Sequence, residues 1–121
     1  MSTFKCVALT KYLLFSILPI CGYSIEHTIV FENQSICLSK FKLDPRETTG
    51  FHRDEYPHIV IAIQGGTIKR FEPDGTSSEI PLPTGEAVFR PIDPYLEGHN
   101  SVNLSDDVLE AYIIQIKNSS L

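Results

Sequence analysis

Three side chains that can bind a metal ion lie close together in the chain: His52, Asp54 and His58. His52 and Asp54 are two residues apart, so in an extended segment their side chains leave the same face and can converge on one ion. The apolar run 59–63 follows at once, which is typical of a buried strand. The sequence therefore predicts a site at the entrance to this strand.

A second group of residues lies downstream and consists of Gly85, Pro91, His99 and Asn103. Together the two groups resemble the paired motifs of the cupin superfamily. The second family motif runs Gly, five residues, Pro-x-Gly, two residues, His, three residues, Asn. All four residues fall on its positions, with three extra residues between Pro91 and His99.

The first cupin motif runs Gly, five residues, His-x-His, three or four residues, Glu, six residues, Gly. Laid on this chain, it places His52 on the first His, Asp54 on the second, His58 on the Glu and Gly65 on the final Gly. Arg46 stands where the opening Gly is expected. The substituted ligands, Asp54 and His58, are still metal-competent side chains, so the pattern is that of a variant site.

The resemblance covers residues 36–117 and implies a single-domain, all-β cupin-like barrel, also called a double-stranded β-helix or jelly roll. It implies that His52, Asp54, His58 and His99 point into the barrel and bind one divalent metal ion. Imidazole and carboxylate ligands suit Fe, Mn, Zn, Ni or Cu, and the residues do not choose among them. Glu97 and Asn103 are the residues expected to orient a ligating imidazole through its other nitrogen.

Short alternating segments separated by turn residues also predict an all-β sandwich or barrel. The expected strands are 25–32, 35–43, 58–64, 67–72, 78–82, 87–90, 100–104 and 108–117. A break in alternation at Ser39-Lys40 predicts a bulge there, with Ile36 and Leu38 on the inward face before it. The continuous apolar run 59–63 predicts a strand that is covered on both sides.

The first 24 residues have the layout of a secretory signal peptide, because Lys5 and Lys11 precede a short apolar run and no acidic residue occurs before Glu26. Small residues in Gly22-Tyr-Ser24 predict cleavage before residue 25, and lipoprotein processing at Cys21 is the alternative. The domain is then 25–121, secreted or periplasmic. The apolar run is too short to span a bilayer, so no membrane association is expected after cleavage.

Removal of Lys5 and Lys11 leaves 8 basic and 15 acidic residues, a formal charge of −7. Such a chain has no excess of cations for binding phosphates, so nucleic acid is excluded as a partner. A mature domain of roughly 97 residues is close to the size at which a core barely stabilises itself, which favours a homodimer.

Several functions fit the candidate site, and the sequence leaves open whether the protein is an enzyme. The first is a metal-dependent oxygenase or isomerase acting on a small organic acid, because His52, Asp54 and His99 match a two-His, one-carboxylate triad. The alternatives are a non-catalytic domain for a small ligand or structural metal, and a degenerate barrel used in assembly or host contact. Arg53 and Arg90 are candidate carboxylate clamps, with solvent the favoured setting for Arg90.

Overall fold

The computed structural model describes residues 26–117, and all of its regular elements are β-strands. They are β1 (Glu26–Glu32), β2 (Ile36–Leu43), β3 (His58–Gln64), β4 (Gly66–Phe71), β5 (Ser77–Leu82), β6 (Ala87–Arg90), β7 (Asn100–Asn103) and β8 (Leu109–Ile116). Each predicted strand is present, and no end differs from the prediction by more than one residue. Alternation and turn residues were sufficient signals for this class of fold.

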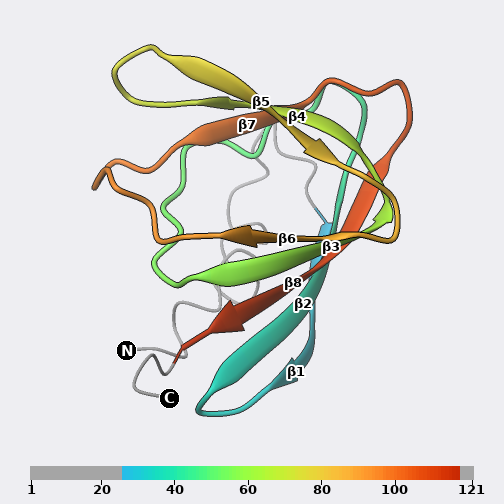
Figure 1. Cartoon of the computed structure of the whole chain (residues 1–121), viewed down its shortest axis with the longest axis vertical. Coiled ribbons are helices and arrows are strands. Elements are labelled where there is room, and N and C mark those ends of the chain that lie inside the picture. Colours follow the sequence, from blue (N-terminus) through green and yellow to red (C-terminus); the bar gives the residue numbers. More distant parts are fainter. Residues whose placement is uncertain (1–25, 118–121) are drawn as a thin grey trace, which may run out of the picture.

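The strands form two antiparallel sheets that face each other as layers (Figure 1). The larger sheet has five strands in the order β1-β2-β8-β3-β6, and the smaller has three in the order β5-β4-β7. Neighbours such as β2 and β8 are far apart in the sequence, so the larger sheet forms only when both ends of the domain meet. The prediction of an all-β barrel is confirmed.

The barrel interior changes from polar to apolar along its length. Residues that are directly opposed in antiparallel strands present their side chains on the same face. Gln115, His58 and Arg90 are opposed in this way across β8, β3 and β6, and they form a polar row. Further along lies the apolar core, which consists of Leu43, Val60, Ala62, Leu82, Leu109 and Ala111.

The predicted bulge at Ser39-Lys40 is wrong. Strand β2 alternates without interruption, and Cys37, Ser39 and Leu43 are all buried on its inward face. The irregularity lies in the partner strand β1, between Ile29 and Phe31. The error arose because a small polar residue, Ser39, occupies an inward position, while apolar Ile36 and Leu38 alternate with the buried residues on the opposite face.

The run 59–63 is covered on one face, so the prediction of a strand buried on both sides is also wrong. Val60 and Ala62 are buried with His58, whereas Ile59 and Ile61 are half-buried and Ile63 is 38% exposed. Apolar residues on the outer face of a sheet are common in soluble proteins, so a continuous apolar run does not by itself indicate two-sided burial.

The segment that leads into β3 runs antiparallel to β7. The amide of Arg46 donates to Asn103 O at 2.8 Å, and that of Thr49 donates to Ser101 O at 2.8 Å. Arg46 adopts a φ of 65°, the left-handed conformation that normally favours glycine. The cupin motif has its opening Gly at this position, so the backbone turn is kept although the residue is replaced.

The predicted signal peptide, residues 1–24, lies outside the described range, and so does the end of the chain after residue 117. Within residues 26–117 no helix is long and apolar enough to cross a membrane. Export and the start of the mature chain therefore stay predictions.

Candidate metal centre

The backbones of His52 and His99 form an isolated antiparallel bridge. The amide of His52 donates to His99 O at 2.9 Å, and the amide of His99 donates to His52 O at 2.8 Å. This double exchange places both side chains on one face, and the ring centroids are 4.5 Å apart at 58°. Two imidazoles that are distant in sequence are thus fixed beside each other by main-chain hydrogen bonds.

Gly98 makes this close approach possible. Its φ is +83°, and a Cβ at this position would lie 1.9 Å from the carbonyl oxygen of His52. A side chain at residue 98 would therefore separate the two segments or be strained in the left-handed region. The geometry of the candidate centre therefore requires Gly98 as well as the imidazole of His99.

Asp54 completes a group of three potential ligands. Its carboxylate oxygens lie 3.6 Å from Nε2 of His52 and 3.6 Å from Nε2 of His99. All three ligand atoms lie within 4.8 Å of one another. These distances are too long for hydrogen bonds. They are close to the ~3.4 Å that separates two ligands bound tetrahedrally to one ion at typical bond lengths.

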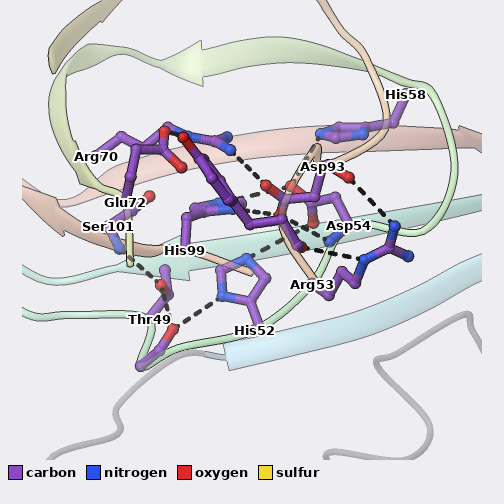
Figure 2. A network of polar contacts seen from close by, with 12 residues as sticks. Thr49, His52, Arg53, Asp54, His58, Arg70, Glu72, Asp93, His99 and Ser101 are labelled. Atoms are coloured by element: carbon purple, nitrogen blue, oxygen red, sulfur yellow. Dashed lines mark hydrogen bonds and ion pairs between the residues drawn. The ribbon is translucent and has the colours of Figure 1, made fainter. Parts of the chain in front are cut away.

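Hydrogen bonds at Nδ1 orient every imidazole of the centre. The acceptors are Gly50 O for His52 at 2.9 Å, Tyr56 O for His58 at 3.0 Å and Asp93 Oδ2 for His99 at 2.6 Å. A carbonyl or carboxylate oxygen can only accept, so each Nδ1 carries a proton, and Nε2 is the ring nitrogen that is left to bind a metal ion. Three Nε2 atoms are thereby available around Asp54, the arrangement that a metal ion needs (Figure 2).

His58 lies beside this group rather than within it. The ring is buried on the inward face of β3, and its Nε2 is 3.8 Å from Oδ2 of Asp54. The inward direction of His58 is the one that its place on the Glu of the first cupin motif implied, whereas a register shifted by one residue would have turned it outward. Its role as a fourth ligand stays a prediction, because the compact set of mutually close ligand atoms comprises His52, Asp54 and His99.

Asp93 is the residue that ties the centre together, and it was missed in the sequence. Its side chain is 0% exposed. Oδ2 accepts from Nδ1 of His99 at 2.6 Å and from the amide of Asp54 at 3.1 Å, while Oδ1 accepts from Arg70 at 2.6 Å. Figure 2 shows this network from close by. One buried carboxylate therefore positions two of the three candidate ligands.

The surroundings of Asp93 and His99 favour the protonation states that a metal site requires. Burial opposes ionisation of Asp93, but hydrogen bonds from Asp54 and His99 and the positive charge of Arg70 outweigh it and lower the pKa of Asp93. Burial lowers the pKa of His99, with His52 and Arg70 acting in the same direction against Asp54 and Asp93. The carboxylate is thus ionised and the imidazole neutral.

Neither of the two residues expected to orient an imidazole is a partner of the Nδ1 atoms of His52, His58 and His99. Glu97 is exposed. Asn103 is fully buried, but its amide donates to the carbonyl oxygens of Leu43 and Asp107 and fixes the turn after β7. The sequence signal for Asp93 was its position between Pro91 and Pro94 in the loop before His99. A loop has no helix or strand periodicity, so the direction of the Asp93 side chain could not be predicted.

The centre opens into an internal cavity of about 140 Å³. Its polar part holds His52, Asp54, His58, Arg70, Arg90 and His99, and its apolar part is lined by Phe41, Leu43, Val60, Ile68, Ile80, Leu82 and Ile113. The side chains of His52 and Asp54 are 32% and 23% exposed, so solvent reaches the polar part. The arrangement can hold a metal ion and a small molecule side by side.

The two arginines proposed as carboxylate clamps differ in their settings. Arg53 donates to the carbonyl oxygens of Asp93 and Tyr95 at 3.2 Å each, so it secures the loop before His99. Arg90 lines the cavity, and the favoured prediction that it faces solvent is wrong. Its place opposite His58 in the sheet register turns it inward. Burial and the nearby positive charge of Arg70 lower the pKa of Arg90.

Comparison with known proteins identifies the fold. No family model matches the chain. A β-alanine degradation protein, BauB of Pseudomonas aeruginosa, is 28% identical over 78 residues, which cover 64% of this chain and 78% of that protein. A cupin domain from Bordetella pertussis is 26% identical with a TM-score of 0.68, covering 82% of this chain and 99% of that one. The polyketide cyclase RemF from Streptomyces resistomycificus is 21% identical with a TM-score of 0.59, covering 84% and 72%.

Proposed function

Since the chain has the cupin double-stranded β-helix fold, we propose that it is a metal-dependent enzyme of the oxygenase or isomerase class that acts on a small organic acid. The proposal rests on one observation: a ring nitrogen of His52, a ring nitrogen of His99 and a carboxylate oxygen of Asp54 lie within 4.8 Å of one another. Two imidazoles and one carboxylate leave further coordination positions open, as in non-haem Fe(II) oxygenases.

A divalent ion at these residues would supply Lewis-acid or redox chemistry. The chain's own contribution is to hold the ligands in place. Asp93 and Gly50 O fix the imidazoles of His99 and His52, and mostly apolar side chains line the rest of the cavity. Such preorganisation is what a protein adds to the chemistry of the metal itself.

The substrate class is supported by charge and by one relative. Arg90 gives the polar part of the cavity a guanidinium group, which suits a carboxylate, whereas the guanidinium of Arg70 is bonded to Glu72 and Asp93. The relative named for β-alanine degradation is associated with a small molecule that carries a carboxylate. The alternative function, a non-catalytic domain for a small ligand or a structural metal, uses the same residues.

Metal content is the first test. The mature protein, purified without a histidine tag, should contain close to one equivalent of Fe, Mn, Zn, Ni or Cu by elemental analysis. Iron together with oxygen uptake on a candidate acid supports an oxygenase, and conversion without oxygen supports an isomerase. Stoichiometric metal with no turnover of any acid favours the binding domain, and absence of metal after loading contradicts the proposal.

Export and self-association are proposed on other grounds. Residues 1–24 have signal-peptide character, which supports a secreted or periplasmic protein. A homodimer is supported by the small size of the domain and by apolar residues exposed on the surface, such as Phe31 and Phe89. Fractionation of cells and light scattering of the purified protein test these two proposals separately.

A further inference from the structure

We propose that Arg90 anchors the carboxylate of a monocarboxylic acid whose uncharged, apolar body of about six carbon atoms fills the barrel interior. This inference rests on the proposed metal centre, beside which the acid would bind. It adds the anchoring residue, the size of the acid and the character of its tail.

The register of the larger sheet gives Arg90 its direction. Arg90 of β6 is directly opposed to His58 of β3, and His58 is opposed to Gln115 of β8. The three side chains share the inward face, and all three line the cavity. Because Nε2 of His58 is 3.8 Å from Asp54, the row leads directly to the metal centre.

Arg90 differs from the other arginines in the described part of the chain. Arg46, Arg53 and Arg70 each donate to protein oxygen atoms. Within residues 26–117, the side chain of Arg90 has neither a hydrogen bond nor an ion pair, although it is half-buried and attracted by Asp54, Glu72 and Asp93. A partly desolvated guanidinium without an acceptor is unfavourable, so a bound anion would relieve this cost.

The nearby carboxylates of Asp54, Glu72 and Asp93 attract Arg90 without accepting a hydrogen bond from it, and Oε1 of Glu72 is buried with no partner among the described residues. Glu72 accepts from Nε of Arg70 at 2.6 Å, and Asp93 accepts from the same guanidinium and from His99. Asp54 lies between the imidazoles of the metal centre. A carboxylate ligand would accept two parallel hydrogen bonds from the planar fork of Arg90, which no side chain in the described part of the chain does.

The cavity limits the size of the acid. Its volume of about 140 Å³ is similar to the ~150 Å³ of an apolar engineered cavity that holds a benzene molecule. An apolar body of about six carbons therefore fits with the carboxylate at the polar end. Polycyclic molecules and dinucleotides are too large.

The side chains that line the cavity determine which chemical groups the ligand can carry at the end far from its carboxylate. Beyond the metal centre and the arginines, most of the lining is apolar, and its polar members His27, Ser39, Thr49, Ser101 and Gln115 are all uncharged or weakly basic side chains. Asp54 is the one carboxylate among the described lining residues, and it lies at the metal centre. An ammonium or a second carboxylate at the far end of the ligand would be buried without an oppositely charged side chain, which is unfavourable. Amino acids and dicarboxylates should be excluded.

Calorimetric titration of the metal-loaded mature protein tests the inference. The probes are hexanoate, its neutral analogue hexanamide, and the tail-charged analogues 6-aminohexanoate and adipate. Hexanoate should bind at least about tenfold more tightly than each of the other three. Arg90→Gln should weaken hexanoate by about tenfold or more and leave hexanamide unchanged, with the metal content unaltered. Arg90→Lys should bind with intermediate affinity, because it keeps the charge but loses the fork.

Lys42→Gln is the matched control, because it removes one positive charge from an exposed position on β2 and should leave hexanoate binding unchanged. Equal affinity of wild type and Arg90→Gln for hexanoate, at equal metal content, overturns the anchor while the metal centre stands. Binding of adipate as tightly as hexanoate overturns the apolar tail. If the protein binds no metal but still binds hexanoate through Arg90, the proposed metal function fails and the anchor stands.

Discussion

His52 and His99 donate their backbone amides to each other's carbonyl oxygens, so two loops that are 47 residues apart in sequence meet at a single pair of residues. The side chains leave this pair on one face, with ring centroids 4.5 Å apart. A cluster built in this way depends on the main chain as much as on its ligands. Substitutions that disturb the backbone should therefore affect metal binding without removing any ligand.

Gly98→Ala tests the backbone pair. The new Cβ would meet His52 O at 1.9 Å and the residue would be strained at a φ of +83°. We expect a loss of stability of roughly 3 kcal/mol or more, together with a loss of metal, by thermal unfolding and elemental analysis. Gly75→Ala is the control: its φ is +91° but nothing lies within 4 Å, so only the conformational cost of about 1 kcal/mol applies. Equal effects of the two substitutions would contradict this role of Gly98.

Replacement of both imidazoles tests the ligand set. The double substitution His52→Ala and His99→Ala should abolish metal binding while the circular dichroism of the β-strands is retained. Loss of the fold together with the metal would show that the ion is structural. His58→Ala should weaken metal binding less than His52→Ala alone or His99→Ala alone, because His58 lies outside the compact group of ligand atoms. A larger effect for His58→Ala would place it among the ligands.

Asp93→Asn tests the buried network. The amide cannot match the ionised carboxylate as a partner for both His99 and Arg70. Metal affinity should fall about 10- to 100-fold in competition with a chelator, because the orientation and basicity of His99 change. Stability should fall by roughly 3 kcal/mol, because Arg70 loses a buried partner. Asp106→Asn, which alters an exposed ion pair with Arg46, should change stability by less than about 1 kcal/mol and leave affinity unchanged.

Arg46 offers a test of backbone strain that is independent of the metal. Arg46→Ala and Arg46→Gly both remove the side-chain bonds to Leu104 O, Ser105 O and Asp106. Glycine also relieves the φ of 65°, so it should be more stable than alanine by about 1 kcal/mol in urea unfolding. If alanine is as stable as glycine, the left-handed conformation carries no cost at this position.

Removal of the ion should lower the melting temperature if the site is occupied in solution. A ligand that binds only the folded state stabilises it by about 2.7 kcal/mol at a concentration 100 times its dissociation constant. Differential scanning calorimetry with and without a chelator measures this effect. The His52→Ala and His99→Ala double variant serves as the control, because its melting temperature should not respond to the chelator.

The strands were predictable because each carries local signals, namely alternation of apolar residues and the turn residues between strands. The meeting of His52, Asp54 and His99 was predictable from the spacing of the two motifs. Asp93 was not, because its partners Asp54 and Arg70 are 39 and 23 residues away and no local pattern relates them. The direction of Arg90 also depended on strand register, which pairing with β3 determines.

If the proposed metal centre is occupied in the cell, its assembly from two distant loops would make the lifetime of the protein depend on the supply of trace elements. Neither loop contains all three ligands, so a partly folded chain should bind the ion only weakly. An ion that binds only the folded state lowers the fraction of unfolded chains, which are the chains that proteases cleave. Growth in medium depleted of transition elements should thus reduce the abundance of this protein at constant messenger level.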